Sequence, residues 1–234
     1  LLPISLIYSF VLSIRHKLFD WGILKSKSYD IPNICVGNLN LGGTGKTPHI
    51  EYLVRLLSDK YNIAVLSRGY GRKTKGFLVA NSSHTHEDIG DEPLQYFKKF
   101  SDITIAVDED RCDGMERLLQ EETPPQIVLL DDAYQHRKIR PGLNILLTDY
   151  YYLYSKDHLV PAGRLRDIKT AAKRADIIVV TKSPEVLTPY YKKDTEESLK
   201  ALPHQKLFYS YIDYQELKPL SQYCFDNNIK ETKT

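Results

Sequence analysis

An α/β fold, in which a mainly parallel sheet is covered by helices on both faces, is predicted by two features of the sequence. Short apolar runs alternate with helical patterns along most of the 234 residues, and this alternation is typical of strand–helix–strand units. A glycine-rich loop lies between the first apolar run of this series and the helical pattern that follows it. That order is found where the edge of a parallel sheet binds phosphates.

The first element predicted is an N-terminal helix. Residues 1–14 are apolar except for three serines spaced four residues apart, which would line one side of a helix, and residues 15–21 add a basic cluster and aromatic side chains. An apolar run of about 14 residues is shorter than the ~20 needed to span a bilayer. We therefore expect residues 1–21 to lie in a membrane interface. The alternative is a helix packed on the core or on a second subunit.

The glycine-rich loop spans residues 36–48 and reads Val-Gly-Asn-Leu-Asn-Leu-Gly-Gly-Thr-Gly-Lys-Thr-Pro. Its glycines let backbone N–H groups turn toward phosphate oxygens, the lysine reaches the β- and γ-phosphates, and the last threonine can ligate Mg²⁺. The loop predicts a P-loop NTPase-like fold that binds a nucleoside triphosphate and Mg²⁺. The predicted nucleotide-binding residues are Asn40, Gly42, Gly43, Thr44, Gly45, Lys46 and Thr47.

One position of this loop departs from the usual spacing. Asn40 stands where G-x-x-x-x-G-K-T has its first glycine. Asn tolerates a positive φ better than other non-glycine residues, so we expect Asn40 to adopt one and preserve the turn. The alternative, a glycine turn before a helix with an incidental lysine, is disfavoured by the strand–loop–helix order.

The remaining elements follow from apolar runs and helical spacing. Strands are predicted at residues 31–36, 62–66, 103–107, 126–130, 143–147 and 176–180. Helices are predicted at residues 48–58, 94–100, 114–121, 168–174 and 188–201. The strands read as continuous apolar runs, which indicates a sheet buried on both faces.

Three parts of the chain are predicted: a membrane-interface helix and lead-in (residues 1–28), a nucleotide-binding lobe (29–150), and the start of a smaller second α/β lobe (151–234). A tyrosine-rich segment followed by a Pro-Ala-Gly turn, at residues 150–163, marks the second boundary. The chain begins with Leu1 and not Met, and residues 226–234 are polar. We therefore expect both ends to be cut and the second lobe to be truncated.

A pair of acids ends the strand predicted at residues 126–130. Asp131 and Asp132 follow this apolar run directly. In P-loop proteins an acid at the carboxyl end of a neighbouring strand holds Mg²⁺, because that edge of the sheet carries the ligands. We therefore predict that Thr47, Asp131 and Asp132 form the metal side of the site. Without the P-loop, two acids that merely begin a turn would be the better interpretation.

Composition narrows the choice of partners. Lys and Arg number 32 against 30 Asp and Glu, and the net charge of +2 gives no argument for nucleic acid. The three cysteines include no C-x-x-C pair, so neither a disulfide framework nor a zinc site is predicted. A reducing location, facing the cytosol, fits this usage best.

Several motifs occur in one order along the chain. They are Gly42-Gly43-Thr44-Gly45-Lys46-Thr47-Pro48, Ser67-Arg68-Gly69-Tyr70-Gly71-Arg72, Gly90-Asp91-Glu92-Pro93, Asp131-Asp132 with Gln135-His136-Arg137, and Pro161-Ala162-Gly163 with Leu165-Arg166. With these motifs the sequence resembles the tetraacyldisaccharide 4′-kinases, which phosphorylate a lipid A precursor in Gram-negative bacteria. The resemblance extends from the first helix to about residue 182.

The resemblance implies a reaction and a place. The γ-phosphoryl group of ATP would be transferred to the 4′-hydroxyl of a lipid A disaccharide 1-phosphate, at the cytoplasmic face of the inner membrane, with no protein partner implied. It also implies that Asp91 is the general base beside catalytic Lys46; helix capping is the alternative use of Asp91. The substrate-binding residues that it implies are Arg68, Tyr70, Arg72, Gln135, His136 and Arg137.

Departures from the family pattern leave alternatives open. Asp167 replaces the usual Glu of Leu-Arg-Glu, and no C-terminal histidine that could partner Asp91 is found. A membrane-associated ATPase switch of the partitioning type also uses a Gly-Gly-x-Gly-Lys-Thr loop, but it has Lys before the glycine pair where this chain has Leu41. A nucleotide-binding scaffold without turnover is the third alternative.

Overall fold

A computed structural model of the chain describes residues 1–213. Its strands are β1 (Asn33–Asn38), β2 (Ile63–Ser67), β3 (Leu78–Val79), β4 (Thr104–Val107), β5 (Ile127–Asp131), β6 (Leu143–Asp149), β7 (Ile177–Thr181) and β8 (Lys206–Tyr209). They form one sheet in the order β3-β4-β2-β5-β1-β6-β7-β8. Every neighbouring pair is parallel except β3 and β4, which confirms the predicted mainly parallel sheet.

The helices are α1 (Leu2–Asp20), α2 (Lys46–Leu57), α3 (His86–Ile89), α4 (Asp91–Lys99), α5 (Arg111–Leu118) and α6 (Pro189–Leu199), with 3₁₀ turns η1 (Tyr154–Lys156) and η2 (Lys169–Arg174). All the predicted helices are present, although the one predicted at residues 168–174 is a 3₁₀ helix. The short elements β3, β8, α3 and η1 were not predicted, because two to four residues carry too little periodicity.

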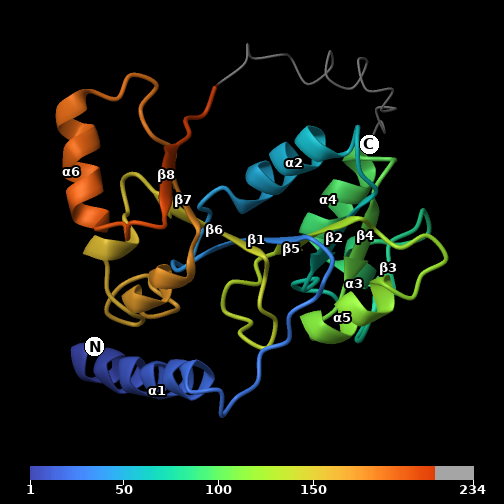
Figure 1. Cartoon of the computed structure of the whole chain (residues 1–234), viewed down its shortest axis with the longest axis horizontal. Helices are drawn as coiled ribbons and strands as arrows, with labels where there is room; N and C mark the ends of the chain where they lie inside the picture. Colours follow the sequence, from blue (N-terminus) through green and yellow to red (C-terminus); the bar gives the residue numbers. More distant parts are fainter. Residues whose placement is uncertain (214–234) are drawn as a thin grey trace, which may run out of the picture.

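Helices cover both faces of the sheet, as predicted. One core cluster joins the strands to Ile50 and Val54 of α2 and Tyr96 of α4. The other cluster contains Met115 and Leu118 of α5 and extends to η2 and α6. Figure 1 shows α2 above the central strands and α5 below them.

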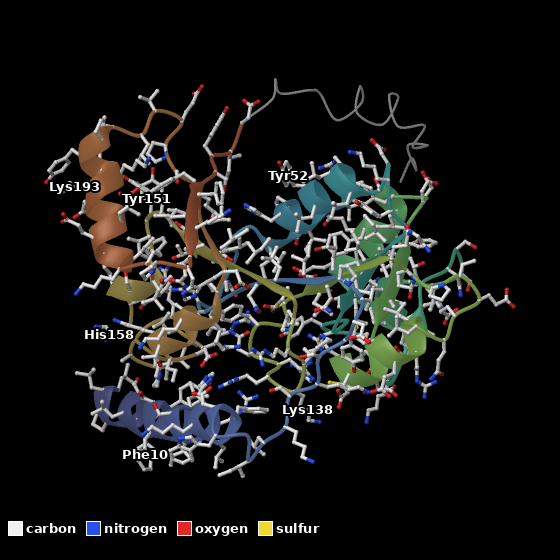
Figure 2. The ribbon with its side chains drawn as sticks, viewed as in Figure 1. Phe10, Tyr52, Lys138, Tyr151, His158 and Lys193 are labelled. Carbon is white, nitrogen blue, oxygen red and sulfur yellow. The ribbon has the colours of Figure 1, made fainter. Side chains whose placement is uncertain are left out.

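The N-terminal helix lies along one side of the protein, separated from the sheet by the chain that follows β6 (Figure 1). α1 has 19 residues, so it is longer than the apolar run that predicted it. Tyr8 and Leu12 pack against the second core cluster. Leu6, Ile7 and Phe10 of the opposite side are 67–68% exposed, and Figure 2 shows Phe10 pointing away from the rest of the protein.

The parallel order brings the predicted site residues to one edge of the sheet. β1 and β5 are neighbours, with Val36 opposite Asp131, so the loop after β1 and the acids after β5 begin side by side. The ligand-binding edge of such a sheet is the carboxyl edge. Strands β7 and β8 extend this same sheet beyond residue 151. The division at residue 151 remains a prediction, and residues 214–234 of that part lie outside the described residues.

Candidate active site

The P-loop turns sharply between β1 and α2. Gly42 has φ 107° and Gly45 has φ 85°, a left-handed region that other residues rarely adopt. Gly45 is the N-cap of α2, so the helix begins at Lys46. The first N–H groups of a helix lack intrahelical partners and carry the positive end of its dipole, so this turn is suited to bind phosphate.

Polar side chains brace the loop from two strands. Asn38 at the end of β1 donates through Nδ2 to Thr44 Oγ1 at 2.8 Å, and Thr181 of β7 donates to the Thr44 carbonyl at 2.9 Å. The expectation that Asn40 adopts a positive φ was wrong. Asn40 instead forms an antiparallel bridge with Leu165, and its Nδ2 donates to Asp157 at 3.1 Å, so the backbone there is extended and paired across the loop.

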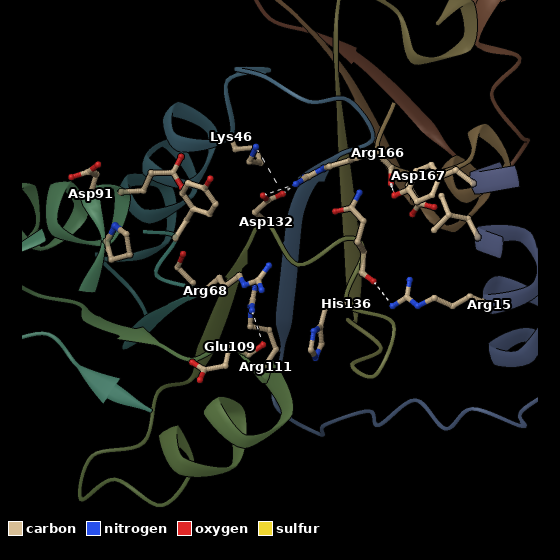
Figure 3. A pocket seen from close by; sticks show the side chains of 17 residues that line it. Arg15, Lys46, Arg68, Asp91, Glu109, Arg111, Asp132, His136, Arg166 and Asp167 are labelled. Atoms are coloured by element: carbon tan, nitrogen blue, oxygen red, sulfur yellow. Dashed lines mark hydrogen bonds and ion pairs between the residues drawn. The ribbon is translucent and has the colours of Figure 1, made fainter. Parts of the chain in front are cut away.

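A cavity of about 770 Å³ opens beside the P-loop lysine (Figure 3). Residues predicted to be catalytic, metal-binding or substrate-binding line this cavity together: Lys46, Arg68, Tyr70, Asp91, Asp132, Gln135 and His136. The P-loop residues from Asn40 to Thr44 line a smaller neighbouring cavity of about 120 Å³. Tyr8, Leu12 and Arg15 of α1 also line the large cavity, so the sheet edge and the N-terminal helix share it.

Asp131 is fully buried, and its two oxygens differ in their surroundings. Tyr96 Oη donates to Oδ2 at 3.3 Å, whereas Oδ1 has no hydrogen-bond partner within residues 1–213. Burial, with the nearby charges of Glu92 and Asp132, raises the pKa of Asp131 to about 7. An unpartnered buried carboxylate oxygen, a second acid and the hydroxyl of the P-loop threonine form a donor set that suits Mg²⁺, which prefers hard oxygen ligands.

Asp132 lies between two cations. Arg166 donates to it from both terminal nitrogens, one of them to Oδ2 at 3.0 Å, and Lys46 Nζ is 3.8 Å from Oδ1. Burial alone would raise the pKa of Asp132, but the hydrogen bonds and charge of Arg166, with the charge of Lys46, hold it below its ordinary value. Asp132 is therefore ionised, and Figure 3 shows its contacts with both cations.

Two acids of α4 face this edge. Gly90 is the N-cap of α4, so Asp91 is the first residue of the helix and not its cap. Asp91 is exposed at the cavity wall opposite Arg15 and Asp167 (Figure 3). Glu92 accepts a hydrogen bond from Thr47 Oγ1 at 3.3 Å, a contact to the P-loop that the sequence did not predict.

Of the predicted substrate-binding residues, four line the cavity. Tyr70 is 85% exposed, and Gln135 Nε2 donates to the Asn38 carbonyl at 2.7 Å. Burial, together with the charge of Arg111, lowers the pKa of His136, so its imidazole is neutral near pH 7. The fourth is Arg68, which is exposed.

Arg72 and Arg137 do not line this cavity. Arg72 donates to the Gly76 carbonyl at 2.7 Å and pairs with Glu109. Arg137 holds the end of α1, donating to the His16 carbonyl at 2.9 Å and to Asp20 at 2.8 Å. Both guanidinium groups have partners on the protein, so direct substrate contact remains a prediction for them.

The sequence assigned no role to Arg166, Arg111 or the inner side of α1, although all of them line the cavity. The signal for Arg166 was its place in Leu165-Arg166, a motif quoted for the resemblance without a role. Nothing in the sequence placed the α1 side chains against this edge, because helical periodicity gives a face but not its neighbour.

Comparison with known proteins decides the family. The sequence model of the family described as tetraacyldisaccharide-1-P 4′-kinase, LpxK, matches residues 1–223. The chain belongs to this family. The resemblance that the motifs indicated is therefore confirmed.

Several curated tetraacyldisaccharide 4′-kinases are similar to this chain. The one from Bacteroides thetaiotaomicron is 51% identical over 221 residues, which are 94% of this chain and 58% of the relative. The one from Flavobacterium johnsoniae is 51% identical over 214 residues, 92% of this chain and 63% of the relative. The chain thus spans about three fifths of the length of the curated relatives it matches.

A solved structure supports the fold. LpxK from Aquifex aeolicus, crystallised in complex with ATP, superposes with a TM-score of 0.72 at 31% identity. The match covers 93% of this chain and 84% of that chain. The predicted P-loop NTPase-like α/β fold is therefore confirmed, and the P-loop described above lies in a family with a known ATP complex.

Proposed function

We propose that the protein is an ATP-dependent kinase that phosphorylates the 4′-hydroxyl of a lipid A disaccharide 1-phosphate at a membrane surface. Family membership supports this reaction. The observation that carries the proposal is the shared cavity. Lys46 and Asp132 of the sheet edge line the same cavity as Tyr8 and Leu12 of α1, whose other side is apolar and exposed. A nucleotide and a lipid headgroup could therefore meet there.

In this proposal ATP is bound by its phosphates. Backbone N–H groups of the loop from Gly42 to Gly45 surround the phosphate oxygens, and the Lys46 ammonium binds the terminal phosphates. Fixed donors of this kind stabilise the charge that spreads over the transferred phosphoryl group. Arg166, which binds the same carboxylate of Asp132 as Lys46, adds a second cation at the same place.

The acids fit one divalent cation. Thr47, Asp131 and Asp132 are the ligands that would hold Mg²⁺, and Glu92 orients the Thr47 hydroxyl. When bound, Mg²⁺ supplies charge neutralisation on the β- and γ-phosphates. Asp131 lies too deep for the sugar, since it is fully buried and does not line the cavity. We therefore place it on the metal side and not among the groups that contact the acceptor.

Asp91 is the base in this proposal. Its carboxylate accepts the proton of the 4′-hydroxyl while the sugar oxygen attacks the γ-phosphorus and the bond to the β-phosphate oxygen breaks. Exposure at the cavity wall supports the role, because the acceptor can reach an exposed carboxylate. Asp91 also follows the Gly90 cap, so a short helix fixes its direction.

The acceptor is recognised around the same cavity. Arg68 is suited to the 1-phosphate, because guanidinium binds phosphate through two hydrogen bonds. Tyr70, Gln135 and neutral His136 offer hydrogen bonds to sugar or amide groups. Arg72 and Arg137 act in this proposal through the loops and the helix that they hold.

α1 would bind the membrane. Among the described residues it is the one helix whose length and composition allow a span, and only 11% of that window is buried. Its polar inner side contacts the protein, so we place it in the interface plane, at the cytoplasmic face of the bacterial inner membrane where ATP is available.

One assay tests the proposal against the partitioning-type ATPase. We expect the protein to transfer radiolabelled γ-phosphate from ATP to a lipid A disaccharide 1-phosphate, resolved by thin-layer chromatography, and to consume little ATP without it. ATP hydrolysis stimulated by lipid vesicles alone, with no labelled lipid, would support the switch instead. Leu41 in place of the lysine that such switches carry already favours the kinase.

A further inference from the structure

A buried hydrogen bond joins α1 to the loop that carries Arg166. His16 Nε2 lies 2.6 Å from Asp167 Oδ1, and the two side chains are 7% and 1% exposed. Arg137 Nη1 lies 3.1 Å from His16 Nδ1, so Nδ1 is the acceptor and Nε2–H donates to Asp167. Arg174 Nη2, 3.5 Å from Asp167 Oδ2, balances the charge of this carboxylate. Removing the imidazole leaves the buried carboxylate with one hydrogen bond fewer, which is costly because water cannot replace it there.

Other residues of α1 hold the same loop at two more points. Tyr8 Oη donates to the Arg166 carbonyl at 3.1 Å. Ser5 Oγ donates to the Leu159 carbonyl at 2.9 Å and accepts from the Ala162 N–H at 3.1 Å. The loop at residues 159–167 has no helix or named strand of its own, so contacts with α1 on one side and backbone pairing with residues 39–41 on the other define its position.

The loop at residues 159–167 places the Arg166 guanidinium at the same sheet edge as the P-loop. The Arg166 N–H donates to the Leu39 carbonyl at 2.8 Å, directly after β1. The Arg166 guanidinium donates to Asn38 Oδ1 at 2.5 Å and to both oxygens of Asp132. Asp167 follows Arg166 directly, so the group that pairs with α1 and the group that pairs with the metal acid are neighbours in the chain.

We infer that His16 and Asp167 are positioning residues that couple the seating of α1 to the placement of Arg166 beside the transferring phosphate. The inference rests on the proposed kinase function and adds a role for the inner side of the membrane helix. A displacement of about 1 Å in a charged group at a reacting centre can cost about 100-fold in rate. α1 would then serve both as membrane anchor and as a wall that sets the geometry of the active site.

A double-mutant cycle in kcat tests this coupling. His16→Ala should lower kcat about tenfold or more, with little change in the KM for ATP, because the P-loop is intact. In an Arg166→Ala background the same change should lower kcat less than about twofold, since the group that His16 positions is gone. His16→Gln, which restores an N–H donor toward Asp167, should recover most of the rate.

The matched control is Ser13→Ala. Ser13 lies on the same helix, but its hydroxyl donates only to the Ser9 carbonyl within α1. Its kcat should stay within about twofold of the wild type in both backgrounds. Equal losses from His16→Ala with and without Arg166 would overturn the coupling and assign His16 a purely structural role.

A second measurement does not depend on phosphoryl transfer. The Leu165 and Arg166 N–H groups donate to the His158 and Leu39 carbonyls, so their hydrogen exchange reports opening of the loop. Exchange at these amides should be at least about tenfold faster in His16→Ala than in Ser13→Ala. Unchanged exchange would refute the coupling even if the lipid is phosphorylated. If the wild-type protein phosphorylated no lipid but exchange were still faster in His16→Ala than in Ser13→Ala, the kinase proposal would be refuted. The link between α1 and the loop would stand.

Discussion

Lys46 Nζ lies 3.8 Å from Asp132 Oδ1, and Arg166 binds both oxygens of the same carboxylate. The ammonium of the P-loop, an acid at the end of β5 and an arginine from a distant loop thus form one charged row at the sheet edge. The two cations and the acid of this row determine the local charge that ATP and Mg²⁺ would meet when they bind. Other residues that line the cavity lie between this row and the acceptor site, and between it and α1.

Removing the charge of Lys46 tests the nucleotide end of this row. Lys46→Met keeps the length of the side chain but loses the ammonium. We expect ATP affinity to fall about tenfold or more and kcat to fall about 100-fold or more, because the lysine contacts phosphates before and during transfer. Isothermal titration and the transfer assay measure the two effects. Lys60→Met, at an exposed position after α2, is the control, and normal turnover in Lys46→Met would exclude the proposed phosphate contact.

Substitution of Asp91 tests the catalytic step separately from ATP binding. Asp91→Asn should lower kcat about 1,000-fold while ATP affinity changes less than about twofold, because the amide cannot accept the proton of the sugar hydroxyl. Asp102→Asn changes another exposed acid, beyond the end of α4, and should behave as wild type. If Asp91→Asn retained its rate, the base would have to be sought elsewhere in the cavity.

The sheet edge could be predicted from the sequence because few principles determine it. Continuous apolar runs gave the parallel strands, and parallel order places the loop after β1 and the acids after β5 at one edge. Lys46 and Asp132 therefore meet by topology alone. The family motifs then added Asp91 and His136, which the structure places on the walls of the same cavity.

What could not be predicted depends on loops and on docking. Arg166 is 34 residues from Asp132 and sits on an irregular segment, where periodicity carries no information. Asn40 was expected to replace a glycine by adopting a positive φ, but pairing with Leu165 holds it extended. In the sequence, His16 belongs to the basic cluster that was expected to lie at the membrane interface. In the structure it faces the protein interior, because Asp167 provides a buried partner.

The raised pKa of Asp131 predicts a pH-dependent stability. Burial raises this pKa to about 7, from about 4 in the unfolded chain, so the folded state binds the proton more tightly. The stabilisation that follows is complete below pH 4 and is lost as the pH rises through 7. Asp131→Asn keeps a neutral group, so its free energy of unfolding relative to wild type should increase between pH 5 and pH 8, by at most about 1.4 kcal/mol per pH unit.

Urea unfolding in the presence of a chelator measures this difference at each pH, so that no divalent cation contributes. Asp102→Asn, the same change at an exposed position beyond the end of α4, provides the comparison. A flat profile for Asp131→Asn would mean that Asp131 is ionised throughout this range in the folded protein.

The exposed side of α1 predicts the last effect. Phe10 is 67% exposed and lies on the face turned away from the protein. Burying a side chain of this size in a lipid interface gains about 1.5–3 kcal/mol, so Phe10→Glu should weaken binding to phosphatidylethanolamine–phosphatidylglycerol vesicles by about 10- to 100-fold. ATP affinity and the melting temperature should stay unchanged, because Phe10 contacts neither the cavity nor the core. Tyr52→Glu changes a 60%-exposed aromatic on α2 and should leave vesicle binding intact. Equal binding by Phe10→Glu and wild type in a flotation assay would show that α1 does not contact the lipid through this face.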